Sequence, residues 1–500
     1  MGNALTLLLA AIVFCVVALI AAVQLGSGDY SVAATLVVLV AIAFAALIFG
    51  RKRPFEAVVL TVAVSCYLLL GRGFAYQRIG SIFFAGELVL AFCLLSYLAR
   101  FYQGRFTLLP RSPLSLPLFL LGFYSLIHLV FDYQAHGFLA LRDSCVIYYT
   151  LFFFVSYQLG RIEGVDDFVA KALLVMSPFV LIADLLHGYA PGIMSAARSI
   201  KVGDVPLLLP HPDATTSTVF GLFLWLYFKS THGARAPVPW FIGAVAVLGY
   251  LVVGARGAAY VAIAALLGFL LLAGQRRFLF LGLPCVAVVA AVLLFALESA
   301  DPTVSRANAM REQMKAIVTV GSGQSQSADT TKWRLGWWRR ITTDVMATNP
   351  LFGLGFGVDI YSPFHREFFR TPHVSEDQTR VRGAHNAFFT LLARGGIIGA
   401  ALFLWVVAAQ LWYFWRAAKA TESGLIPPRH LFFWGFSISG FVITFFQYTW
   451  EAPYSAIPFW TCFGMACASL DKQIEEAKEP EEEEVEAQKP VLAGRLLPAR

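Results

Sequence analysis

The sequence predicts an all-α, polytopic integral membrane protein with about fourteen transmembrane helices and one long polar loop late in the chain. Of its 500 residues, 58% are hydrophobic and only 14% are charged, which is far too apolar for a soluble protein of this size. Apolar runs of about 20 residues, each long enough to cross a hydrocarbon core of roughly 30 Å, recur along almost the whole length. A membrane β-barrel would instead require alternating apolar and polar residues.

The apolar runs divide the chain into four parts. We expect an N-terminal transmembrane bundle over residues 1–297, an outer loop over 298–384, C-terminal transmembrane helices over 385–470 and an acidic, disordered cytoplasmic tail over 471–500. The expected spans lie near residues 4–25, 30–49, 55–71, 80–99, 114–131, 142–160, 166–187, 213–229, 237–253, 256–274, 277–297, 385–415, 430–449 and 453–470. The first span is not expected to be a cleaved signal peptide, because it lacks a charged N-terminal region and another span follows closely.

The lysines and arginines of the short loops predict the orientation. When Arg51, Lys52 and Arg53 are placed in the cytoplasm and the spans alternate, fifteen basic residues fall inside and only six fall in the outer short loops. This arrangement puts both termini in the cytoplasm and the long segment 298–384 on the opposite side of the membrane.

Charge and cysteine content limit the classes of ligand and partner that we expect for the protein. The net charge is +7 although the tail from Asp471 holds nine acidic and five basic residues, so the rest of the chain is strongly basic. A basic membrane protein suits anionic lipids and phosphate-bearing substrates, and no aromatic-basic motif of a nucleic-acid module is present in the sequence. The seven cysteines fall within or at the ends of expected spans without metal-binding spacing, so we expect small packing residues and neither a disulfide framework nor a metal.

The outer loop contains a predicted amphipathic helix near residues 330–348. Its apolar residues recur at a spacing of four: Trp333, Trp337, Ile341 and Val345. We expect this helix to lie on the membrane surface with its tryptophans at the headgroup level and to end before Pro350. The glycines that follow at 353, 355 and 357 are no nucleotide-binding fingerprint, because no strand of a βαβ unit precedes them.

Two arginines stand out at the outer ends of expected spans. Arg142 could form a salt bridge with Asp143, anchor its helix at the membrane surface, or face the bundle interior as a phosphate ligand. Arg256 lies in a hairpin made otherwise of small residues, which allow a ligand to approach closely. For Arg256 we favour ligand binding over membrane anchoring.

His385 is the candidate catalytic residue. It lies at the mouth of an apolar helix, three residues after Arg382, and that helix is expected to be broken at Gly395, Gly396 and Gly399. Histidine titrates near neutral pH and is the usual general base. The alternative is a residue at a helix N-terminus that bonds only its own turn. Other histidines that could substitute for it are His211, His365 and His373.

Three motifs in this order resemble the O-antigen ligase and O-antigen polymerase superfamily, the Wzy/WaaL-type bacterial membrane glycosyltransferases. They are the hairpin Gly254-Ala-Arg-Gly-Ala258, the segment from Lys332-Trp-Arg-Leu-Gly-Trp-Trp to Asn349-Pro-Leu-Phe-Gly-Leu-Gly-Phe-Gly, and His385-Asn-Ala-Phe-Phe-Thr-Leu-Leu-Ala-Arg-Gly-Gly. The resemblance covers roughly residues 210–415, and it implies a GT-C-like helical fold in the bacterial inner membrane with the outer loop facing the periplasm.

The resemblance also implies a function. Members use a glycan carried on undecaprenyl diphosphate in lipopolysaccharide or exopolysaccharide biosynthesis. Ligases transfer it to the lipid A core, and polymerases transfer it to the next repeat unit. The reaction is regarded as inverting and metal-independent, so no cofactor is expected. Whether this chain is a ligase or a polymerase stays open, because no motif encodes the acceptor.

Carried over by motif, the resemblance implies site residues. His385 would be the catalytic histidine, Arg256 the arginine of the hairpin and Arg334 the basic residue of the loop helix. Arg142 matches by its position at the start of a span, and Arg382 joins this set as a further diphosphate ligand. We expect Arg142, Arg256 and His385 to approach one another in an outer cavity under the 330–348 helix.

Arg394 departs from the family pattern, in which an acidic residue often precedes the glycine pair, so we expect a different charge partner there. The chemistry itself is consistent with arginines and one histidine, because a leaving diphosphate needs neutralising and the acceptor hydroxyl must lose a proton. The alternative is a transporter or flippase of a lipid-linked glycan. It is disfavoured because no inverted repeat is visible and the charges lie at the outer ends of the spans.

Overall fold

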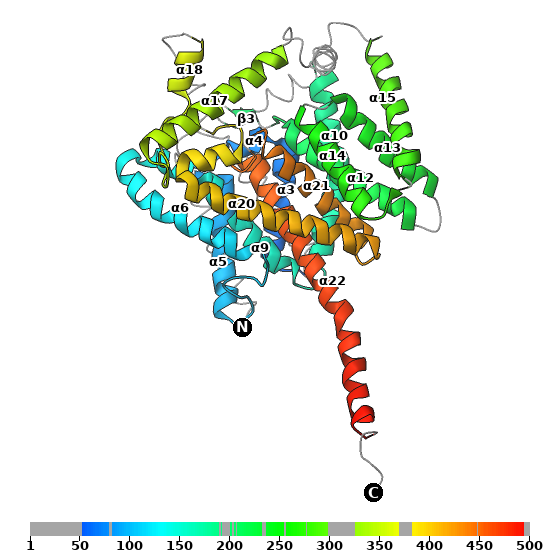
Figure 1. Cartoon of the computed structure of the whole chain (residues 1–500). Coiled ribbons are helices and arrows are strands. Elements are labelled where there is room, and N and C mark those ends of the chain that lie inside the picture. Colours follow the sequence, from blue (N-terminus) through cyan, green and yellow to red (C-terminus); the bar gives the residue numbers. More distant parts are fainter. Residues whose placement is uncertain are drawn as a thin grey trace, which may run out of the picture.

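The computed structural model describes residues 53–494, apart from residues 80–82, 190–191, 193–200, 203–204, 207, 233–236, 255–256, 277, 299–325, 370–382 and 448. The described part is a bundle of α-helices with two short β-hairpins (Figure 1). The first two expected spans, 4–25 and 30–49, lie outside the described residues.

The helices follow the apolar runs of the sequence. The first group comprises α3 (Phe55–Leu70), α4 (Arg72–Ala75), α5 (Ala85–Tyr102), α6 (Ser115–His136), α7 (Phe138–Asp143), α8 (Cys145–Tyr148), α9 (Leu151–Gly160) and α10 (Val165–Tyr189). The second comprises α12 (Pro212–His232), α13 (Pro237–Gly254), α14 (Gly257–Leu272), the π-helical turn η1 (Phe278–Gly282) and α15 (Leu283–Glu298). The third comprises α17 (Gln326–Thr348), α18 (Ser362–Phe369), α20 (Ala387–Glu422), the 3-10 turn η2 (Pro428–His430), α21 (Leu431–Ile443) and α22 (Pro453–Gly494).

Two antiparallel hairpins interrupt the helices. One pairs β1 (Arg78–Ile79) with β2 (Phe83–Phe84), and the other pairs β3 (Lys201–Val202) with β4 (Val205–Pro206). Each strand has only two residues, so neither hairpin forms a layer of its own.

Five described helices are long and apolar enough to cross a membrane. They are Ala85–Tyr102, Ser115–His136, Phe138–Gly160, Val165–His187 and Ala387–Glu422. The remaining expected spans within the described residues coincide with helices, several of them shorter than a bilayer requires. The described part of the chain is therefore predominantly α-helical, consistent with a polytopic integral membrane protein, and the number fourteen stays a prediction.

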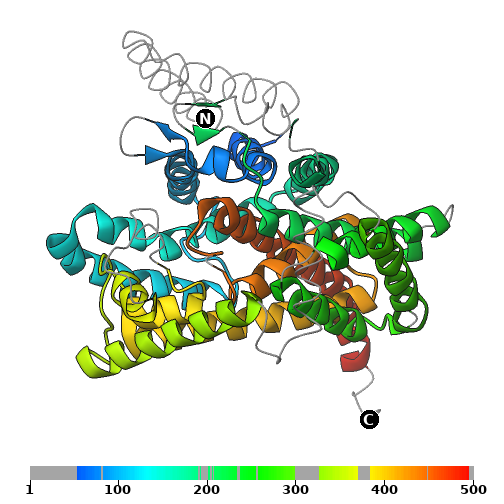
Figure 2. The same ribbon diagram turned by 90° about the horizontal axis from the view of Figure 1, so that it is seen from above.

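The centre of the bundle is formed by the C-terminal helices. α22 packs along α9, and α21 packs along α12 (Figures 1 and 2). Trp434 on α21 and Trp460 on α22 are buried there, together with Trp450 in the segment between these two helices. Large aromatic side chains bury much apolar area, so this region anchors the loops that surround His385.

The loop helix α17 exists where the sequence predicted it, and protein covers its apolar stripe. Trp337, Ile341 and Val345 are buried against α18 and the start of α20, and α17 lies alongside α20 in both views (Figures 1 and 2). The expectation of tryptophans at the headgroups is wrong for Trp337, because protein side chains cover the stripe and its Nε1 donates to the Ile360 carbonyl at 3.0 Å.

The last helix extends into the acidic end of the chain. α22 continues to Gly494, through residues 481–484 where the sequence predicted a disordered tail. Glutamate, alanine and lysine are strong helix formers, and they dominate this stretch.

Candidate functional site

His385 occupies a strained turn at the start of α20. Its backbone φ is +52°, and no other non-glycine residue in the described part of the chain has a positive φ. A side-chain-bearing residue in this region costs free energy, and such residues cluster at functional sites. The turn is held by its neighbour Asn386, whose Oδ1 accepts from the Phe388 and Phe389 amides and caps the helix.

Aromatic side chains from α17 enclose the imidazole. The ring centroids of Trp333 and Trp337 lie 6.0 and 6.1 Å from that of His385, both in edge-to-face orientation. Trp338 Nε1 donates to the Ala384 carbonyl at 2.8 Å, so the same helix also fixes the backbone just before the histidine. The amphipathic pattern of α17 thus covers His385 instead of a membrane surface.

The segment between α21 and α22 supports His385 from another direction. The Thr444 carbonyl accepts from the Ala387 amide at 3.1 Å, and the Phe445 carbonyl accepts from Asn386 Nδ2 at 2.9 Å. Gln447 lies beside the ring, where the Nδ1–H tautomer of His385 donates to Gln447 Oε1 at 3.4 Å. These contacts involve a segment about sixty residues away in the sequence.

Positive charges shape the electrostatics of the site. Burial lowers the pKa of His385 to about 4, and the charges of Arg334 and Arg72 act in the same direction, whereas the contact with Gln447 raises the pKa. The imidazole is therefore neutral at neutral pH and can accept a proton. A negatively charged ligand beside the two arginines would offset their effect and raise this pKa.

Arg72 reaches this region from α4. Its Nη2 donates to His211 Nε2 at 3.1 Å, and its guanidinium lies 5.5 Å from the centroid of the Tyr454 ring. The backbone of the same turn is fixed too, because the Arg72 amide donates to the Leu209 carbonyl at 2.9 Å. Cation–π and hydrogen-bonding contacts of this kind hold a guanidinium in one orientation.

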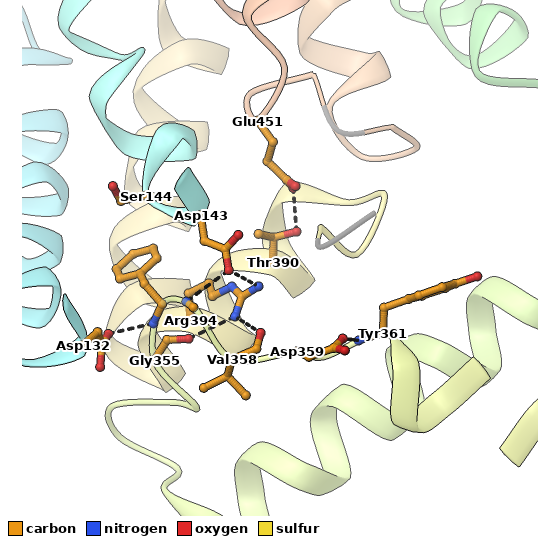
Figure 3. Close-up of polar contacts among 12 residues, drawn as sticks. Asp132, Asp143, Ser144, Gly355, Val358, Asp359, Tyr361, Thr390, Arg394 and Glu451 are labelled. Atoms are coloured by element: carbon orange, nitrogen blue, oxygen red, sulfur yellow. Dashed lines mark hydrogen bonds and ion pairs between the residues drawn. The ribbon is translucent and has the colours of Figure 1, made fainter. Parts of the chain in front are cut away.

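A second network holds the glycine-rich segment after α17 (Figure 3). Arg394, buried in α20, pairs with Asp143 at 2.8 Å and donates to the carbonyls of Gly355 and Val358 at 3.1 and 2.6 Å. Asp143 also accepts from the Gly357 amide at 3.1 Å. The different charge partner expected for Arg394 is therefore Asp143.

The predicted break in α20 lies at Gly396, where φ is 61° and ψ is −156°. The backbone after α17 fills the break, since the Ile397 amide donates to the Pro350 carbonyl at 2.9 Å. A Cβ atom at Gly396 would collide with the Leu351 carbonyl. This glycine lets the glycine-rich segment pack directly on the helix that His385 precedes.

The structure describes three of the five predicted site residues. His385 and Arg334 belong to one region, and Arg142 is partly buried at the end of α7, next to the Asp143 that pairs with Arg394. Arg256 and Arg382 lie outside the described residues, so the expected approach of Arg256 to His385 stays a prediction. The catalytic and diphosphate-binding roles of all five likewise remain predictions.

Three residues of the site escaped the sequence analysis. They are Arg72, Gln447 and Glu451. The available signal was weak: Glu451 is a single acid between two expected spans, and Arg72 is a basic residue in an outer loop. Only the fold brings residues 72, 334, 385 and 447 together.

A narrow cavity lies beyond Tyr454, on the side of α12 and α21. Its polar lining includes Asp213, Ser217, Thr449 and Ser455. Within the described ranges, no group of three or more histidine, cysteine or acidic side chains is arranged to hold a metal ion.

A comparison with protein families finds a match within the chain. Residues 241–404 match the family model described as O-antigen ligase, and the match supports the O-antigen ligase and polymerase superfamily for this chain. The matched range includes Arg334 and His385, whereas Arg72, Arg142, Gln447 and Glu451 lie outside it. A search of curated proteins finds no match.

Proposed function

We propose that the protein transfers a glycan from undecaprenyl diphosphate to an acceptor hydroxyl at the periplasmic face of the bacterial inner membrane, with both termini in the cytoplasm. The acceptor is the lipid A core if the chain is a ligase, or the next repeat unit if it is a polymerase. The observation that carries the proposal is His385 itself, held in a strained turn, kept neutral and acted on by the charges of Arg334 and Arg72.

In this mechanism His385 is the general base. The acceptor oxygen attacks the sugar carbon, the bond from that carbon to the diphosphate oxygen breaks, and the hydroxyl proton moves to the imidazole. The leaving group is undecaprenyl diphosphate, which departs with the bonding electron pair. A single displacement of this kind inverts the configuration at the sugar carbon.

Arginines bind the leaving diphosphate in this mechanism. The guanidinium is always charged and can grip two phosphate oxygens at once, so Arg334, Arg72, Arg142, Arg256 and Arg382 form the proposed diphosphate-binding set. A bound diphosphate would offset the positive charge near His385 and raise its pKa toward neutrality. The donor would then increase the basicity of the group that activates the acceptor.

A His385→Ala variant tests the proposal with purified protein, lipid-linked donor and either acceptor. Transfer is expected to fall at least about a hundredfold, within the range for loss of a general base, while the protein still folds. His365→Ala is the matched control, because His365 in α18 is also a buried histidine of the loop region but packs on Tyr361, the residue before that helix. Full activity in His385→Ala, or no transfer by the wild type, would overturn the proposal, and the latter result would favour a transporter.

A further inference from the structure

Glu451 packs against the loop before α20. It is distant from that loop in sequence and lies outside the matched family region. It follows Trp450 in the segment between α21 and α22, and Thr390 Oγ1 donates to Glu451 Oε1 at 2.7 Å (Figure 3). Its other carboxylate oxygen occupies the space where a Cβ atom of Gly383 would stand. The carboxylate therefore packs directly on the backbone two residues before His385.

Thr390 connects this carboxylate to the strained turn. Its Oγ1 accepts from the Ala384 amide at 3.0 Å while its hydroxyl hydrogen points to Glu451. The Ala384 carbonyl accepts from Trp338 Nε1, so both polar groups of the residue before His385 have a side-chain partner. A residue with φ of +52° needs such support, because an unconstrained chain would relax from this conformation.

We propose that Glu451 is a positioning residue for His385, acting through Thr390 to hold the Ala384–His385 backbone in its left-handed turn. The catalytic consequence rests on the proposed function, since it concerns the orientation of the proposed base. In this proposal Glu451 acts on the backbone before His385 and does not bind the substrate.

The surroundings of Glu451 make this support sensitive to protonation. Burial raises the pKa of Glu451 to about 7, opposed by the Thr390 hydrogen bond and the Arg394 charge, while the Asp143 charge raises it further. Cys145 is also in contact, its thiol donating to the Glu451 carbonyl. The ionised carboxylate is the stronger acceptor, so positioning is expected to improve as pH rises through about 7.

The test uses full-length protein with lipid-linked donor and acceptor. Thr390→Val removes both hydrogen bonds of Oγ1, and Glu451→Ala removes the one between these two side chains. Each variant is expected to lower kcat about tenfold, with KM for the donor within about twofold of wild type. The double variant should lose no more than either single one, because both changes break the same connection. Thr390→Ser should keep wild-type kcat. Glu451→Gln should keep most of kcat and show a smaller rise near pH 7 than the wild type, because only the contribution of Glu451 is removed.

Matched controls separate positioning from general damage. Thr421→Val removes another buried hydroxyl of α20, one that bonds only within its own helix, and Glu367→Gln alters an exposed acid of the loop region. Both should retain wild-type kcat and pH profile. If Glu451→Ala does not fold, the comparison of Thr390→Val with Thr390→Ser still decides the outcome.

The inference fails if His385→Ala abolishes transfer while Thr390→Val and Glu451→Gln behave as wild type at every pH. It also fails if the effects of Thr390→Val and Glu451→Ala multiply in the double variant. Loss of the proposed function gives a different result, namely activity that does not depend on His385 at all.

Discussion

Two histidines at opposite ends of α20 differ in the charges that surround them. His385 precedes the helix and is acted on by the charges of Arg334 and Arg72. His430 follows it in η2, where its ring lies 4.0 Å from Asp166 and 3.5 Å from Asp167, and its Nδ1 is 2.7 Å from Ser469 Oγ. Burial lowers the pKa of both, but the carboxylates oppose this effect only at His430.

The ion pairs around the two histidines differ in the same way. Near His430, cations from several helices meet acids: Arg416 pairs with Asp471 at 2.9 Å, Arg161 with Glu475 and Arg429 with Asp167. The first two pairs tie α20 and the residue after α9 to α22, and the third ties η2 to α10. The contrast indicates that one end joins helices through balanced charges. The other end keeps a neutral imidazole beside positive charge, which favours an anionic ligand.

The largest expected effect concerns the ion pair of Arg394 with Asp143, in which opposite charges are balanced as they are near His430. Arg394→Ala should lower the free energy of unfolding by about 3–5 kcal/mol, because it leaves the buried Asp143 without its guanidinium partner. Thermal or denaturant unfolding in detergent measures this change. Replacing Asp143 by alanine as well should recover part of the loss, and a loss below about 1 kcal/mol would show that the glycine-rich segment does not depend on this pair.

The next effect is the pH dependence of stability. The pKa of His385 is about 4 in the folded protein, against about 6.5 when unfolded, so the unfolded state binds more protons between these values. Its contribution to stability is therefore complete above about pH 6.5 and is lost as the pH falls toward 4. Unfolding of His385→Gln, followed over this range, should show a clearly weaker acid destabilisation than the wild type.

His430→Gln is the comparison for that experiment. It should remove a smaller part of the acid destabilisation, because Asp166 and Asp167 favour the protonated ring and oppose the effect of burial. Arg334→Gln sharpens the result further, since loss of its charge should raise the pKa of His385, which NMR of labelled histidine can follow. An unchanged pKa in that variant would mean that Arg334 does not act on the ring.

Much of the fold follows from apolar periodicity alone. The runs near 114–131, 166–187 and 385–415 became α6, α10 and α20, and the stripe of Trp337, Ile341 and Val345 became the buried face of α17. What covers that stripe could not be predicted, because an apolar face shows that something covers it without identifying the partner. Membrane lipid and the α18–α20 surface present the same chemistry to a tryptophan.

The site was predictable only in part, for a related reason. His385 and Arg334 carry a motif, so their positions stand out in the sequence. Arg72 and Glu451 act through tertiary contacts, with Tyr454 and Thr390 respectively, that no local spacing encodes. The left-handed turn at His385 was equally hidden, because its stability comes from Asn386, Thr390 and the distant segment 444–451 acting together.

The smallest expected effect tests whether the two ends of α20 act independently. Arg416→Ala should cost only about 1 kcal/mol, because the pair with Asp471 is partly exposed and Asp471 keeps hydrogen bonds from Tyr157 and Tyr413. Glycan transfer and the pH profile near His385 should stay as in the wild type. If this variant lost transfer while remaining folded, charge at one end of α20 would influence chemistry at the other, and the two regions could no longer be treated as independent.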